Sequence, residues 1–177
     1  MFEREIMSDK ETIERARRDE REGKAPSTQA GEFVREEIEH IRKGKHGARS
    51  AKQAIAIGLS KARRAGVALR PPQKGKTSEK TRRSAERAYE KGQAHEPVSR
   101  IRSRAREKAL QREPHEVVSH IALARQARLA AARRTAAARS SAARRAARTK
   151  GPGGRSEAAK KAARTRARGI HVKAASF

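Results

Sequence analysis

One stretch of the chain, residues 31–67, constrains the fold more than any other part. Apolar residues recur at helical spacing through its first half, as Phe33, Val34, Ile38 and Ile41. This spacing predicts a helix over about residues 32–43 with one apolar face. Gly44 follows the helix, and glycine commonly ends helices because it adopts a positive φ angle without strain.

The second half of the stretch predicts another helix, joined to the first by the turn 45–49. Ser50 and Gln53 have the spacing of a capping box, in which two side chains bond to the backbone of the first helical turn. A broad apolar stripe follows, formed by Ala54, Ile55, Gly58, Leu59, Ala62 and Ala65. Gly66 is the expected end of this helix. The stretch therefore predicts a helical hairpin with its apolar faces in contact.

Two residues of the second helix have alternative interpretations. Gly58 lies in the apolar stripe, where it either lets the two helices approach closely or is a tolerated glycine that costs about 1 kcal/mol relative to alanine. Ile57 projects away from the stripe, among polar and charged neighbours. It is either an ordinary exposed apolar residue or a contact for a protein partner or a second copy of the chain.

The hairpin also carries a resemblance to a known family. The residues concerned are Gly44-Lys45-His46-Gly47, the segment from Ser50 to Ser60 with its run KQAIAIGLS, and Ala62-Arg63-Arg64-Ala65-Gly66. In them the chain resembles an uncharacterised bacterial and phage-associated family, known only as a domain of unknown function. The resemblance covers about a fifth of the chain. It implies no activity, although DNA binding is attributed to some members.

Outside the hairpin the chain has little with which to build a core. Of its 177 residues, 34% are hydrophobic but only 2% are aromatic, and much of the hydrophobic fraction is alanine. The net charge is +26, from 46 Lys and Arg against 20 Asp and Glu, and self-repulsion at such a charge disfavours a compact state. We therefore expect an all-α protein with a small helical hairpin core, extended charged helices and a partly disordered basic C-terminal tail.

Proline, glycine and charge divide the chain into six expected segments. These are a charged N-terminal helix (1–22), a linker (23–30), the helical hairpin (31–67), a basic Pro/Gly linker (68–77), a helical region (78–129) and a basic Ala/Arg-rich tail (130–177). In the helical region, Thr77 or Ser78 should cap a helix that Gly92 ends. Pro97 and Pro114 should begin two more, since proline suits the first turn. The last of these is expected to continue to about residue 150.

The tail has an extreme charge pattern. From Val117 to Phe177 there are 16 Lys and Arg against a single acid, Glu157. Beyond Ala130 the arginines lie all round the expected helix and no apolar stripe remains, so no core would hold it. In composition, though not by homology, the pattern resembles the Ala/Lys/Arg-rich tails of linker histones and bacterial histone-like proteins.

No segment has the pattern of a catalytic, metal or cofactor site. His115, Glu116 and His120 approach a zinc-protease signature, but the second histidine is one residue too late for both rings to share a helix face. Gly75-Lys76-Thr77 ends like a phosphate-binding loop, yet Arg70 stands where that loop needs glycine. Since cysteine is absent as well, we predict a non-enzymatic protein that uses no metal and no cofactor.

A strongly basic chain without stacking aromatics favours contacts with phosphates over contacts with bases. We therefore predict a histone-like protein that binds nucleic acid largely independently of sequence, with DNA favoured over RNA. The alternative is an adaptor whose hairpin recognises a protein, with the tail only a solvated run of charge. No segment is apolar over a membrane-spanning length, and the expected location is the cytoplasm, at the bacterial nucleoid.

The residues expected to contact nucleic acid form two groups. At the hairpin turn, the free amides at the start of the second helix and the basic side chains around them suit a phosphate. The alternative there is a solvated basic turn whose serine only caps the helix. The hairpin group is Lys45, His46, Arg49, Ser50, Lys52, Lys61, Arg63 and Arg64, and the tail group is Arg133, Arg134, Arg139, Arg144, Arg145, Arg148, Lys160, Lys161 and Arg164.

Overall fold

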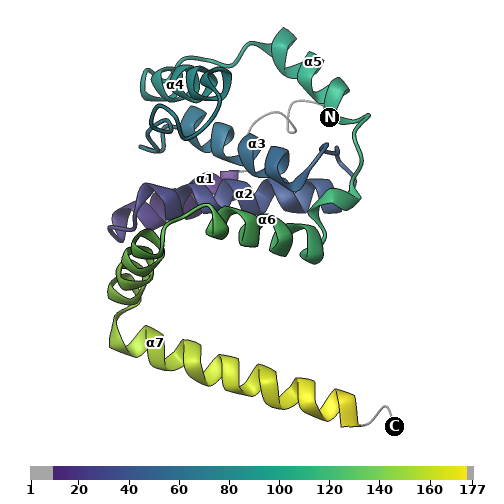
Figure 1. Ribbon diagram of the computed structural model, residues 1–177. Coiled ribbons are helices and arrows are strands. Elements are labelled where there is room, and N and C mark those ends of the chain that lie inside the picture. The colour runs from purple at the N-terminus through teal and green to yellow at the C-terminus, as the bar shows by residue number, and fades with distance from the viewer. Residues whose placement is uncertain (1–9, 175–177) are drawn as a thin grey trace. The chain divides into compact units, whose positions relative to one another are not determined.

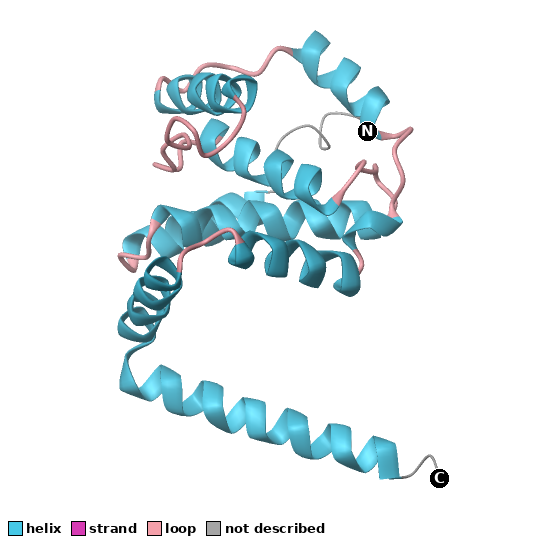
Figure 2. Cartoon of the chain, viewed as in Figure 1, coloured by secondary structure: helices cyan, strands magenta, loops and turns pink. Residues whose placement is uncertain are grey.

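The computed structural model describes residues 10–174, with side chains as far as residue 167. Over that range the chain is all-helical, as the sequence predicts (Figure 1 and Figure 2). Its elements are α1 (Lys10–Arg21), α2 (Pro26–Arg42), α3 (Ala51–Arg64), α4 (Glu79–Gln93), α5 (Arg100–Leu110), the 3-10 helix η1 (Glu116–Val118), α6 (His120–Ala132) and α7 (Ala136–Ala174). The chain divides into two compact units, Met1–Arg128 and Leu129–Phe177.

The expected hairpin is present as α2 and α3, which pack against each other. α2 is longer than predicted because it begins at Pro26, so the expected linker over 23–30 is helix from residue 26 onward. Proline fits this first helical position because an N–H group there would have no partner within the helix. The turn signals of Pro26, Ser27 and Thr28 are thus the beginning of a helix.

Four consecutive helices end with the same backbone motif. At the end of α2, Gly44 N donates to Ile41 O and Lys45 N to His40 O, both at 3.0 Å, with the φ angle of Gly44 at 71°. These two bonds satisfy carbonyl groups that have no partner inside the helix. Gly23, Gly66 and His95 hold the same position after α1, α3 and α4. The predicted helix ends at Gly44 and Gly66 are therefore confirmed.

Gly58 allows the close approach of α2 and α3. A Cβ atom at this position would lie 2.6 Å from Val34 Cα and 2.9 Å from Val34 N, nearer than real Cβ contacts come. Of the two interpretations of Gly58, the structure supports close packing. The largest core side chain, Phe33, is fully buried in a cluster with Ala16, Ala30, Ala62 and Val67.

α1 belongs to the core, although the sequence predicts no more than a charged helix outside the hairpin core. Ala16 is buried in the Phe33 cluster and Ile13 packs against it. Arg15 Nε donates to Glu32 Oε2 at 2.7 Å, which ties α1 to α2. The residues expected to extend this helix toward Phe2 lie outside the part of the chain that the structure describes.

The segment before α6 covers the hairpin turn. Val118 is buried with Ile41, Ala48 and Ala54 in a second cluster. Two backbone bonds join the segments, from Gly47 N to Leu110 O and from Ala48 N to Pro114 O, both at 2.9 Å. The core therefore extends well beyond the hairpin.

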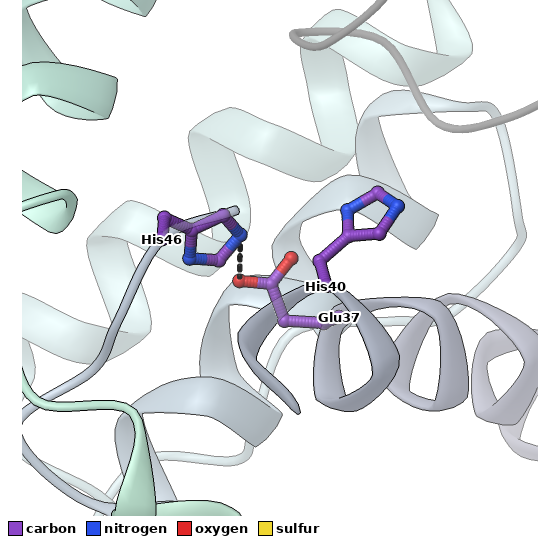
Figure 3. Close-up of side chains that lie close together, drawn as sticks. All are labelled: Glu37, His40 and His46. Carbon is purple, nitrogen blue, oxygen red and sulfur yellow. Dashed lines mark ion pairs between the residues drawn. The ribbon is translucent and has the colours of Figure 1, made fainter. Parts of the chain in front are cut away.

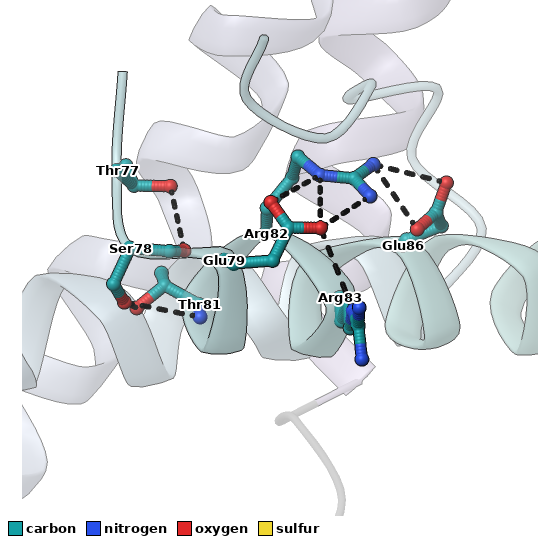
Figure 4. Close-up of polar contacts among 7 residues, drawn as sticks. All are labelled: Thr77, Ser78, Glu79, Thr81, Arg82, Arg83 and Glu86. Carbon is teal, nitrogen blue, oxygen red and sulfur yellow. Dashed lines mark hydrogen bonds and ion pairs between the residues drawn. The ribbon is translucent and has the colours of Figure 1, made fainter. Parts of the chain in front are cut away.

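α4 begins as predicted but does not end as predicted. Ser78 caps it, with its hydroxyl accepting from Thr81 N at 3.3 Å (Figure 4). Hydrogen bonds from Arg82 lower the pKa of the Glu79 carboxyl in the first turn. Gly92 lies inside the helix, where a Cβ would meet Arg63 O at 1.8 Å, so this glycine serves packing on α3 and is not the helix end.

The remaining helices differ from expectation in extent. α5 begins at Arg100 rather than near Pro97, and it buries none of its residues, with Ile101 83% exposed. A break at residues 133–135 separates α6 from α7, so no continuous helix runs to residue 150. A second break lies next to the predicted helix end at about residue 150, because Gly151 has the non-helical angles φ 65° and ψ 176°.

Candidate nucleic-acid interface

The basic side chains of residues 129–167 lie at the surface and are not packed against other segments. Every Lys and Arg between residues 129 and 167 is exposed. That range contains one acid, Glu157, whose Oε1 atom lies 3.0 Å from Lys160 Nζ. Arg139 donates to the carbonyl of Arg134 at 2.7 Å and Arg144 to the hydroxyl of Ser140 at 2.9 Å. All nine tail residues of the predicted interface therefore lie at the surface.

The hairpin turn is only partly the surface that the sequence predicts. Ser50 caps α3 by accepting from Gln53 N at 3.2 Å, and Lys45, Arg49 and Lys52 are exposed. The Gln53 side chain accepts from Arg49 N at 2.9 Å, one residue before the position that a capping box would use. Arg49 also lies 3.5 Å from Glu113, so an acid stands beside the expected phosphate position.

Gly47 does not provide a close approach for a ligand. A Cβ atom there would lie 1.8 Å from the carbonyl oxygen of Glu113, which already occupies the space beside the glycine. The small residue thus serves contact between two segments of the same chain. The sequence could not reveal this because the two segments are far apart along it.

His46 points into the protein rather than toward a phosphate. Its Nε2 atom lies 3.4 Å from Oε1 of Glu37, a residue of α2 that is fully buried (Figure 3). Its Nδ1 atom lies 3.2 Å from the carbonyl oxygen of Gly47. This histidine belongs to an internal cluster of polar groups.

Three further predicted contacts have partners within the chain. Lys61 Nζ lies 2.8 Å from Glu37 Oε2, and Arg64 donates to Glu96 O at 3.2 Å. Arg63 is only 7% exposed and donates to Leu69 O at 3.0 Å. Burial lowers the pKa of its guanidinium. Arg63 therefore stabilises the turn after α3. Its guanidinium is not accessible to a ligand, so the prediction that Arg63 contacts nucleic acid is wrong.

The sequence analysis did not predict a cluster of three possible metal ligands. Glu37, His40 and His46 each offer an atom, and these atoms lie within 4.8 Å of one another (Figure 3). Glu37 and His40 are three residues apart on α2, a spacing that places both on one helix face. That Glu-x-x-His spacing, with a third histidine soon after, is the signal that could have found it.

An open groove of about 410 Å³ lies between α1 and α2 near this cluster. Its walls include Glu11, Arg15, Glu36, His40 and Lys45. The mixture of opposite charges gives the groove no preference for a charged ligand of either sign. It does give solvent a route toward His40.

No protein-family model, curated protein or solved structure matches the chain. The resemblance of residues 44–66 to a phage-associated family therefore stays a prediction. Among the described residues, no helix is both long enough and apolar enough to cross a membrane.

Proposed function

We propose that this protein binds nucleic acid, preferentially duplex DNA, through phosphate contacts made mainly by its tail. The observation that carries the proposal is the set of exposed cations in residues 129–167, one of which has an acid beside it. A polyanion would relieve the repulsion among these charges and release its own counterions. The even spread of arginine around α7 favours contacts that do not depend on base sequence.

The hairpin contributes less to this proposed interface than the tail. Lys45, Arg49 and Lys52 are the exposed cations of its group at the turn, and Arg49 lies beside Glu113. We therefore assign them an accessory role in phosphate binding. Location at the bacterial nucleoid would follow from DNA binding and belongs to the same proposal.

The salt dependence of binding tests the proposal. Duplex DNA and RNA of equal length would be titrated with the full chain and with a chain lacking residues 130–177, at several salt concentrations. Each neutralised DNA phosphate contributes about −0.9 to the slope of log K against log salt. We expect the truncated chain to bind more weakly and with a shallower slope.

A full-length chain with fewer tail charges is the control for the truncation, because it keeps the chain length unchanged. Replacing Arg133, Arg134, Arg144, Arg145 and Arg148 by Gln should reduce the slope by about 4 to 5 if each contacts one phosphate. A salt slope unchanged in both altered chains would contradict the proposal. Equal affinity for RNA and DNA would contradict the preference for DNA but not the binding of nucleic acid.

The alternative function, an adaptor whose hairpin recognises a protein, stays a prediction. Its most specific feature was Ile57, which is half-buried rather than fully displayed. Packing by α1, α4 and η1 also covers much of the hairpin. These observations favour the nucleic-acid proposal over the adaptor.

A further inference from the structure

The inference starts from the buried carboxylate of Glu37. This side chain is fully buried, and neither of its oxygens accepts a hydrogen bond of good geometry within the described part of the chain. Lys61 lies 2.8 Å from Oε2, which leaves Oε1 facing His46. A buried carboxylate oxygen without a hydrogen bond is costly and calls for a cation close by.

The orientation of His46 makes its other nitrogen available to such a cation. The carbonyl oxygen of Gly47 can only accept, so Nδ1 of His46 must carry the proton in their 3.2 Å contact. In the neutral ring Nε2 then presents a lone pair to Glu37 Oε1, 3.4 Å away. Two lone pairs facing each other repel, unless a proton or a metal ion lies between them.

The spacing of the two atoms suits a metal ion. Ligand atoms at about 2.0–2.1 Å from a tetrahedral zinc ion stand about 3.3–3.4 Å apart. The separation of His46 Nε2 and Glu37 Oε1 is 3.4 Å, and all three candidate ligand atoms lie within 4.8 Å of one another. A small movement of the His40 ring would bring all three to bonding distance.

Neighbouring groups are placed to orient the ligands. The carbonyl oxygen of Gly47 lies 3.2 Å from Nδ1 of His46 and orients its ring. Lys61 Nζ pairs with the second oxygen of Glu37 at 2.8 Å. Oε1 of Glu36 lies 3.9 Å from Nε2 of His40, about 1 Å beyond hydrogen-bond distance, so a shift of the ring toward it would let the carboxylate orient a metal-bound His40. Lys45, now 3.3 Å from the same nitrogen, is exposed and free to move toward solvent.

From this geometry we infer that Glu37, His40 and His46 form a binding site for a divalent transition-metal ion of the zinc class. Two imidazoles and one carboxylate form a ligand set that zinc uses, and they leave a fourth position for water or another group. The ion would join the turn 43–50 to α2. It would therefore stabilise the fold where the hairpin turn meets the segment 110–118.

The test is calorimetric titration of the untagged, chelator-treated full chain with Zn²⁺, supported by the visible absorption of bound Co²⁺. We expect one ion per chain and a higher melting temperature with Zn²⁺. His46→Ala and Glu37→Gln should each lower zinc affinity at least tenfold, since even outer partners of metal ligands contribute tenfold or more. His120→Ala, an exposed histidine outside the cluster, is the matched control and should bind as the unaltered chain does.

Zinc affinity that is equal in His46→Ala and the unaltered chain would overturn the inference. So would the absence of a one-to-one binding signal in the unaltered chain, which would leave an ordinary ion pair between His46 and Glu37. If His46→Ala loses its helical circular dichroism, His46→Asn replaces it, because asparagine retains a donor for Gly47 O. Binding retained in His46→Asn would likewise overturn the site.

Discussion

At the scale of single residues, small side chains and buried charges decide how the helices meet. Gly58 lies on α3 where it packs against α2, and Gly92 lies on α4 where it packs against α3. Neither position has room for a methyl group. Lys61 and Arg63 look like surface cations in the sequence, yet one pairs with buried Glu37 and the other is buried itself. Their role in the fold is therefore visible only from their neighbours.

Gly58→Ala is expected to destabilise the protein by about 1–3 kcal/mol, because the added methyl forces α2 and α3 apart. The gain of about 1 kcal/mol from alanine's higher helix propensity would not offset this. Urea unfolding followed by circular dichroism measures the change.

Gly31→Ala is the control for that substitution. Gly31 also lies inside a helix, α2, but no atom beyond its chain neighbours and the adjoining helix backbone lies within 4 Å of where its Cβ would be. Its replacement should raise the free energy of unfolding by up to about 1 kcal/mol. Effects of the same sign at both positions would show that α2 and α3 do not meet closely at Gly58.

At the scale of elements, caps set where the helices of the first unit begin and end. Ser50 and Ser78 each accept a hydrogen bond from the amide three residues later, whereas Ser99 before α5 makes no such bond. α5 also buries none of its residues. A bonded cap fixes where a helix starts but does not decide burial. α2 has no side-chain cap yet carries Phe33 and Ile41 of the core, whereas α6 begins with Ser119 accepting from Ala122 N and buries none of its residues.

Ser50→Ala should lower the free energy of unfolding by about 1 kcal/mol, since it removes the acceptor for Gln53 N. Ser99→Ala should change it by less than about 0.5 kcal/mol, as is usual for surface substitutions. Thermal unfolding of both variants is the measurement. An equal loss at the two positions would argue against a specific role for the Ser50 cap.

At the scale of the whole molecule, the buried core and the most one-sided charge lie in different units. The buried hydrophobic residues identified in the described chain all precede residue 119, whereas the most one-sided charge lies beyond it. Residues 129–167 bury no hydrophobic side chain in that set. The proposed binding function can therefore change with little effect on the folded core.

Removal of residues 130–177 should leave the urea midpoint of the first unit unchanged or slightly raised. Tail residues 130–167, whose side chains the structure describes, include no buried side chain, and loss of the tail reduces the repulsion that accompanies a net charge of +26. A midpoint lowered by an amount equivalent to more than about 1 kcal/mol would mean that the tail packs on the core. Urea unfolding at low and high salt separates this packing effect from charge screening.

The sequence by itself determined the features that depend on near neighbours. Helical periodicity, the Ser50 and Ser78 caps, the ends at Gly44 and Gly66 and the break at Gly151 all follow from residues a few positions apart. The all-α class and the α2–α3 hairpin were predictable for this reason. The start of α2 was missed because proline followed by serine and threonine suits a turn as well as a first helical turn.

Only the tertiary structure decided what depends on residues distant in sequence. The burial of α1, the packing role of Gly92 and the cover over Gly47 come from contacts between segments separated by loops. The same holds for Glu37, which meets both His46 and Lys61 only because α2, the turn and α3 fold together. Short-range patterns report helix formation, whereas long-range packing determines which charges remain at the surface to bind a partner.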